Sequence, residues 1–227
     1  MKIQSKTTLL IISLILSYNA SAGLLLPPSL NPGDSYRLAF ITDSILDPFS
    51  TDITRYDTFV QGKAAESSLT DGTTDWKVIG STAVVDAIDH IGVSSSPIYN
   101  LNGELVAVNS AALWNTGNVD LLNPIKYTQF GSPSVGIGIV FTGTQADGTG
   151  SSSPLGGGPS IVSLGRYTSI ANDWIDNGSG LSVSNSMPFY AISGELTVPA
   201  VPVPAAVWLF GSGLIGLLGM AKKRIVS

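Results

Sequence analysis

The feature that most limits what this chain can be is a charge-free segment near its C-terminus. Residues 205–221 contain no charged side chain, and Lys222, Lys223 and Arg224 follow at once. As a helix the segment is roughly 25 Å long, and a span slightly short of the ~30 Å hydrocarbon core can insert because flanking basic side chains reach the interface. Trp208 stands where an interfacial aromatic residue is expected. The pattern predicts a transmembrane helix with its basic end in the cytoplasm and the preceding chain outside.

The N-terminus has the three-part layout of a secretory signal peptide. A short basic head precedes the apolar run 9–16, and the small residues Ala20 and Ala22 stand before Gly23. A buried core helix is the alternative, but an apolar run directly behind a basic head favours export. We therefore expect signal peptidase to remove residues 1–22 and the rest of the chain to leave the cytoplasm.

A Pro-x-Pro motif in the stalk 198–204 leads into the charge-free segment. The motif and the residue after it are Pro202, Val203, Pro204 and Ala205. Together with the span and the basic triplet, residues 201–227 resemble a PEP-CTERM sorting signal, a bacterial C-terminal tail in which the central residue of the motif is usually glutamate. The resemblance implies cleavage by the membrane protease exosortase near the motif, after a transient stay in the inner membrane. It also implies release to the cell surface or to an exopolysaccharide and biofilm matrix.

The chain between the two ends, residues 23–197, has the length of one domain. It contains no cysteine, which excludes disulfides, thiolate metal sites and cysteine nucleophiles, and His90 is its single histidine. All 16 acidic residues and six basic residues lie here, for a net charge of −10. Nucleic acid is therefore excluded as a partner, because no basic patch can neutralise phosphates.

Hydrophobic spacing inside this domain predicts an α+β fold with two early helices and many short strands. The first helix is expected after an N-cap at Ser50 or Thr51, and the second over residues 81–91 on Val84, Val85 and Ile88. The expected strands are 36–42, 76–80, 97–101, 136–142 and 189–193. The glycine- and serine-rich stretch 148–160 is expected to be a mobile loop.

The order of these pieces resembles a known arrangement. The segments that carry the resemblance are 76–81, 97–106, 111–114, 140–148, 172–174 and 189–196. Over residues 35–197 they are similar to the endostatin-like branch of the C-type-lectin-like fold, which implies a single lectin-like domain. The cysteines that clamp that fold are absent here, and so are its zinc histidines and its Glu-Pro-Asn calcium–sugar motif. Packing must therefore replace the crosslinks, and neither ligand follows from the resemblance.

Aspartates are the candidate residues for hydrolysis. A glycosidase needs two carboxylates on opposite sides of the scissile bond. The residues that could supply them are Asp43, Asp47, Asp52 and Asp57, or Asp86 with Asp89. The alternative is that they cap helices, form turns or lie on the solvated surface. For His90 the alternatives are a surface residue at a helix end and a catalytic base.

Two tryptophans with polar neighbours are the candidate carbohydrate site. Trp114 and Trp174 are flanked by asparagine and aspartate, and a ring face with such hydrogen-bonding groups is the usual composition of a sugar site. Their alternative is a place in the core. Asp147, or Asp173 with Asp176, could offer oxygen ligands to Ca²⁺, with a turn as the alternative for Asp147.

The sequence thus favours an exported, non-catalytic binding or structural protein of the cell surface or extracellular matrix. Extracellular polysaccharide is the expected partner, and no cofactor other than Ca²⁺ is considered. A secreted glycosidase that uses paired aspartates is the alternative, and a purely structural matrix protein is the third.

Overall fold

The computed structural model describes residues 23–70, 74–114, 120–157 and 160–200. The predicted signal peptide, residues 1–22, and the predicted sorting signal with its span at 205–221 lie outside these residues. Within the described ranges, no helix is both long enough and apolar enough to cross a membrane.

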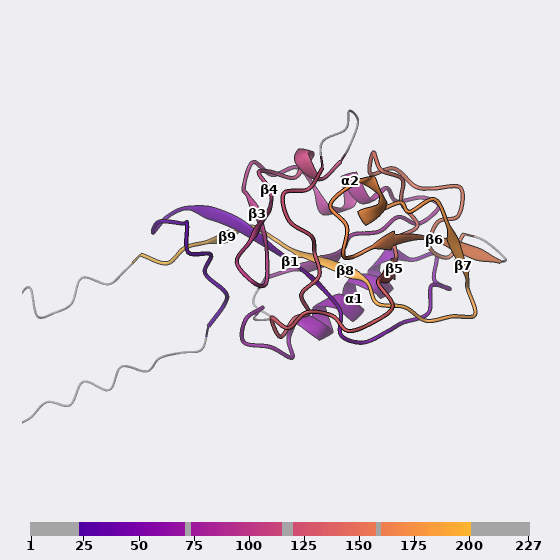
Figure 1. Cartoon of the computed structure of the whole chain (residues 1–227), viewed down its shortest axis with the longest axis horizontal. Helices are drawn as coiled ribbons and strands as arrows, with labels where there is room; N and C mark the ends of the chain where they lie inside the picture. The colour runs from indigo at the N-terminus through magenta and orange to yellow at the C-terminus, as the bar shows by residue number, and fades with distance from the viewer. Residues whose placement is uncertain (1–22, 71–73, 115–119, 158–159, 201–227) are drawn as a thin grey trace, which may run out of the picture.

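The described residues form a mixed α+β fold made of two sheets and two α-helices (Figure 1). The larger sheet has the order β2-β8-β1-β3-β4, with β9 paired to β1. Its strands are β1 (Ser35–Ile41), β2 (Trp76–Val78), β3 (Ile98–Asn100), β4 (Leu105–Ala107), β8 (Tyr190–Ser193) and β9 (Leu196–Thr197). The smaller sheet consists of β5 (Ile139–Phe141), β6 (Ile161–Arg166) and β7 (Gly180–Ser182). The helices are α1 (Ile53–Ala64), α2 (Ala87–Ile91) and the 3-10 turns η1 (Ala111–Leu113) and η2 (Asn172–Trp174).

Strand β1 is the central strand of the larger sheet and is buried on both faces. It pairs in parallel with β3 and antiparallel with β8. Because side chains alternate along a strand, Leu38 and Phe40 enter one hydrophobic cluster, whereas Ala39 and Ile41 enter the other. The predicted strand 36–42 is therefore confirmed, and it separates the two halves of the core.

Helix α1 forms where the apolar spacing predicted it, but its cap is a different residue. Ile53, Tyr56 and Val60 are buried on one face of the helix, as residues three and four positions apart should be. The N-cap is Asp52, whose carboxylate accepts a hydrogen bond from the amide of Thr54. The prediction of Ser50 or Thr51 as the cap is wrong, because the cap lies two residues after Ser50 and one after Thr51.

Helix α2 is much shorter than predicted. The expected helix began at residue 81, but only Ala87–Ile91 is helical, and Val84 is 85% exposed. The backbone of Ser81 is instead used in tertiary contacts: its N–H donates to Thr142 at 2.9 Å, and its carbonyl accepts from Leu155 at 2.9 Å. In a helix that began at residue 81, the Ser81 carbonyl would accept from the amide four residues later, but here it accepts from Leu155 instead.

The expected mobile loop is packed against the domain over its described residues. Leu155 is fully buried in the core. The amide of Ser151 donates to Gly143 at 2.9 Å, and that of Gly156 donates to Pro48 at 2.8 Å. Backbone hydrogen bonds thus hold this stretch at several points along its length.

The first and last segments of the described chain lie together on one side of the molecule. The amide of Gly33 donates to the carbonyl of Val198 at 3.0 Å, and the amide of Val198 donates to Asp34 at 2.9 Å. In Figure 1 the segment that precedes β1 and the segment that follows β9 lie together on the left, whereas β6 and β7 lie on the right. The smaller sheet is therefore far from the points where the chain enters and leaves the domain.

Candidate functional site

A polar groove lies on the smaller sheet, between the serine-rich stretch and strands β6 and β7. Its volume is about 380 Å³, within the range of small-molecule and oligosaccharide sites. The residues that line it are Gln145, Ser151, Ser152, Ser153, Ile161, Ser163, Asp176, Gly178, Ser179 and Gly180. We call it the serine groove. Hydroxyl and amide groups predominate on its walls, and each can both donate and accept hydrogen bonds.

Hydrogen bonds among the lining residues hold the walls of the serine groove in place. The Ser163 hydroxyl donates to the Ser151 hydroxyl at 2.9 Å, which joins strand β6 to the serine-rich stretch. The amide of Ser153 also donates to the Ser151 hydroxyl, at 3.1 Å. The side-chain amide of Gln145 donates to the carbonyl of Gly150, the residue before Ser151, at 2.9 Å. The polar groups are therefore arranged before any ligand arrives.

The turn before β7 supplies the rim of the serine groove. The Asp176 carboxylate accepts from the amide of Gly178 at 3.1 Å, and the Asn177 side chain accepts from the amide of Ser179 at 2.9 Å. Asp176 is the only charged residue among those that line the groove. The side chain of Ile161 is 46% exposed and adds one apolar surface. The groove thus carries a single negative charge in an otherwise neutral polar lining.

The tryptophans predicted to stack on a sugar lie in the core instead. Trp114 is 6% exposed and Trp174 is 2% exposed. Their ring centroids are 6.1 Å apart, and the Trp174 ring also packs 5.5 Å from that of Tyr190. The structure therefore shows the core alternative for both, and neither ring offers a free face to a ligand.

Two of the three aspartates predicted as calcium ligands have other partners, and the third, Asp176, lies at the rim of the serine groove. The Asp147 carboxylate accepts from the hydroxyl and the amide of Thr149, at 2.7 and 2.9 Å, and these hydrogen bonds lower the pKa of Asp147. Asp173 pairs with Arg166 at 3.4 Å and accepts from the Ser169 hydroxyl. Within the described residues, no group of three or more His, Asp or Glu side chains could hold a metal ion.

His90 and Asp57 form a contact that closes the edge of the larger sheet. His90 Nε2 lies 2.9 Å from Asp57 Oδ1, and the same oxygen accepts the amide of Val78 at 2.9 Å. Strand β2 is an edge strand of the sheet, and the amide of its residue Trp76 donates to the side chain of Gln61 at 2.8 Å. Side chains of α1 thus satisfy the outward N–H groups of β2, which protects the edge from pairing with another chain.

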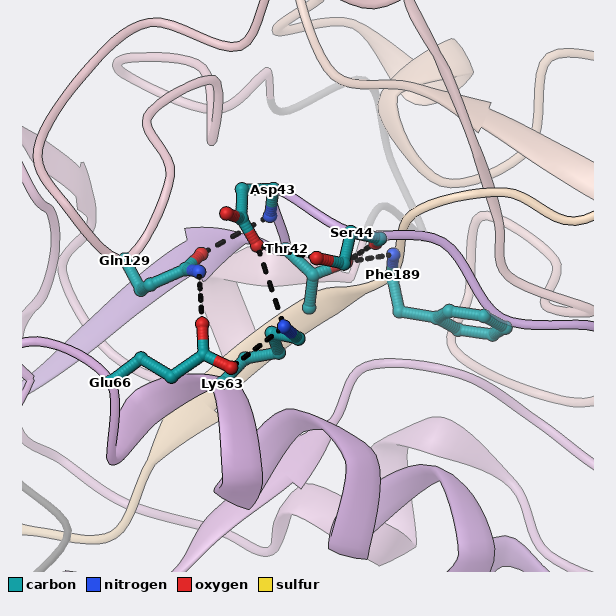
Figure 2. A network of polar contacts seen from close by, with 7 residues as sticks. All are labelled: Thr42, Asp43, Ser44, Lys63, Glu66, Gln129 and Phe189. Atoms are coloured by element: carbon teal, nitrogen blue, oxygen red, sulfur yellow. Dashed lines mark hydrogen bonds and ion pairs between the residues drawn. The ribbon is translucent and has the colours of Figure 1, made fainter.

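Figure 2 shows how Asp43 belongs to a polar network at the end of α1. The amide of Asp43 donates to the buried Gln129 side chain at 3.1 Å, and its carboxylate lies 3.9 Å from Lys63 Nζ. Lys63 also pairs with Glu66 at 2.7 Å, and Gln129 donates to Glu66 at 3.5 Å. The network joins three distant segments of the chain, which is a structural role for Asp43.

The other candidate aspartates also serve local structure. Arg55 donates two hydrogen bonds of 2.7 Å to Asp47, and these bonds hold the pKa of Asp47 below its usual value. Asp52 caps α1, and Asp86 accepts the amide of Gly150 at 2.6 Å. Asp89 lies exposed on α2. The contacts of Asp43, Asp47, Asp52, Asp57 and Asp86 match the capping and pairing alternative.

Sequence reasoning missed the serine groove. Residues 151–153 belong to the stretch expected to be a mobile loop, and Asp176 and Asn177 stand out in the sequence as polar neighbours of Trp174. The available signal was weak: two separate clusters of hydroxyl and amide residues, with no spacing that places them face to face. Comparison with other proteins adds nothing here, since the chain matches neither a protein-family model nor a curated protein.

Proposed function

We propose that this protein is an exported, non-catalytic binding module and that the serine groove holds a neutral oligosaccharide. The observation that carries the proposal is the groove itself, with a volume of about 380 Å³ and a lining of serine hydroxyls and one glutamine amide. Such groups exchange hydrogen bonds with sugar hydroxyls, which also donate and accept. A neutral sugar is favoured because the domain is acidic and the only charge in the groove is that of Asp176.

The proposal places the domain outside the cell. Signal peptidase removes residues 1–22, residues 205–221 hold the chain in the inner membrane, and exosortase releases it near Pro202 into an exopolysaccharide matrix. The position of the groove supports this arrangement. The described chain begins and ends on one side of the domain, with β6 and β7 on the other (Figure 1). A domain anchored through its C-terminal segment therefore presents the groove away from the membrane.

For the fold, we propose the endostatin-like branch of the C-type-lectin-like class. The order of elements along the chain supports it: α1 and α2 come early, and short strands follow. The hydrolase alternative has less support. It needs two free carboxylates beside a bound sugar, whereas the residues lining the serine groove include one carboxylate, Asp176.

The test uses the full chain in a polyoxyethylene detergent, because a maltoside headgroup would compete for a sugar site. Labelled protein is applied to an array of neutral and uronic-acid oligosaccharides. We expect saturable binding to neutral members. Ser152→Trp, at an exposed position in the groove, should weaken binding by at least about tenfold, because the indole fills the site. The matched control is Thr168→Trp, exposed and outside the groove, which should bind normally.

Three results would overturn the proposal. They are the absence of binding to any neutral glycan, equal binding by the two tryptophan variants, and preference for the uronic acids. New reducing ends in the bound glycan, lost in a single Asp→Asn variant, would establish the hydrolase instead.

A further inference from the structure

Strand β1 carries a buried arginine that has no carboxylate within ion-pair distance among the described residues, although the charge of Glu195 acts on it from farther away. Arg37 is 4% exposed, and its Nε donates to the carbonyl of Ser193 at 2.7 Å. Its Nη1 donates to the Ser110 hydroxyl at 3.2 Å. No carboxylate oxygen of the described residues lies within the 4.0 Å that defines an ion pair. Burial of a cation is costly and is normally offset by a paired anion, so the position invites an external one.

A pocket of about 270 Å³ opens onto this arginine. Its walls carry one further cation, Lys77, and two carboxylates, Asp75 and Glu195. Ile91 and Val93 add an apolar wall. None of these residues belongs to the serine groove, so the two sites are separate. We call this site the Arg37 pocket.

The charged groups of the Arg37 pocket differ in how far they are already engaged. Lys77 Nζ donates to the carbonyl of His90 at 2.7 Å, so the lysine is drawn toward α2. Glu195 accepts from the hydroxyls of Ser94 and Ser96, and these hydrogen bonds lower the pKa of its carboxyl group. Glu195 is therefore ionised at neutral pH. It lies at the exposed mouth of the pocket, whereas Arg37 lies at the buried end.

We propose that the Arg37 pocket binds a free amino acid. The ligand carboxylate pairs with the Arg37 guanidinium, whose planar donors match the two oxygens of a carboxylate. The ligand ammonium lies toward Asp75 and Glu195, and its side chain packs against Ile91 and Val93. A ligand with only a carboxylate pairs with Arg37 but is repelled by Asp75 and Glu195. A ligand with only an ammonium leaves Arg37 without a paired anion. A zwitterion satisfies both ends, and the volume suits a ligand smaller than an oligosaccharide.

The test titrates the full chain, in the same detergent, with the twenty common amino acids by calorimetry. The tightest binder is then compared with two matched analogues, one without the amino group and one without the carboxylate; for valine these are 3-methylbutanoate and isobutylamine. We expect saturable binding of the amino acid and at least about tenfold weaker binding of each analogue. The proposal is overturned if no amino acid saturates at millimolar concentration or if an analogue binds as tightly.

Two variants identify the contacts. Glu195→Gln, at an exposed position, should weaken binding of the amino acid about tenfold, because the ammonium contact is lost, whereas the carboxylate analogue should bind at least as tightly as before, because one like charge at the mouth is removed. Arg37→Lys should weaken binding of both the amino acid and the carboxylate analogue. The near-ultraviolet circular dichroism of this variant shows whether it folds. The control is Asp176→Asn in the serine groove, which should not change amino-acid binding. An unchanged affinity in a folded Arg37→Lys protein, or in Glu195→Gln, would refute the assignment independently of any result on glycans.

Discussion

Replacement of Asp57 tests whether this aspartate closes the sheet edge or serves chemistry. Val78 is fully buried, and its amide has the Asp57 carboxylate as acceptor at 2.9 Å. In Asp57→Ala the amide loses this acceptor, which costs about 1–3 kcal/mol, and the contact with His90 is lost as well. We therefore expect the free energy of unfolding to fall by about 2–4 kcal/mol. Asp57→Asn keeps an acceptor oxygen for Val78 and loses only the charge, so it should cost about 1 kcal/mol.

Urea denaturation of the full chain in detergent measures both Asp57 variants. Hydrogen exchange adds a local readout, since the Val78 amide should exchange faster in the alanine variant than in the asparagine variant. Asp89→Ala is the control, because Asp89 is exposed on α2 beside His90 and should change stability by less than about 0.5 kcal/mol. If Asp57→Asn costs as much as Asp57→Ala, or if Asp57→Ala has no effect, closure of the edge by this carboxylate is refuted.

Four further predictions concern residues in α1 or next to its N-terminal end. Asp47→Asn should make the free energy of unfolding less dependent on pH below about pH 4. The ion pair of Asp47 stabilises the fold above the unfolded pKa, and this stabilisation is lost as the pH falls through the lowered folded pKa. Equal acid unfolding of the two proteins would contradict this. Burial raises the pKa of Tyr56 to about 12, so stability should fall between about pH 10 and 12, where only the unfolded state ionises. Tyrosinate absorbance against circular dichroism checks this, and ionisation before unfolding would refute it. Gly156→Ala should destabilise by at least about 2 kcal/mol, since φ is +66° and a Cβ would overlap the Ser50 carbonyl. Gly62→Ala in α1, where a Cβ meets nothing, should stabilise by about 0.5–1 kcal/mol in the same thermal melts.

Helix α1 and strand β1, the two longest elements of the fold that the sequence predicted, have a long local pattern. Helix α1 has four buried residues at helical spacing, and β1 has an apolar run of strand length. Strands β4, β5 and β7 have three residues each, too few for any periodicity to develop. β5 lay inside a predicted strand, as did the equally short β2 and β3, whereas β7 is defined only by its pairing with β6. Such strands are made by their partners, and the partners are distant in sequence.

The candidate sites divide in the same way. The aspartates were visible as residues, but their partners were not: Asp57 meets His90 across 33 positions, and Asp86 meets Gly150 across 64. The polar sequence neighbours of the two tryptophans make them candidates for a surface site, with a place in the core as the alternative. Burial depends on what the ring packs against in space, and for Trp114 that partner is Trp174. Polar neighbours in the sequence thus do not determine whether the ring points into the core or toward solvent.

Serine and threonine hydroxyls replace part of what crosslinks would do in this cysteine-free, loop-rich fold. Ser81 is fully buried, and its hydroxyl accepts from the amide of Ala87 and from the hydroxyl of Thr144, both at 2.9 Å. The Thr142 hydroxyl donates to the carbonyl of Ile175 at 2.7 Å. Each such bond contributes about 1 kcal/mol, so a few of them together match the 2–4 kcal/mol typical of one disulfide. Hydroxyl residues that suggest an exposed loop in sequence therefore have two roles here. Inside, they satisfy buried backbone where segments cross; on the smaller sheet, the same residue types remain open to solvent and line the serine groove.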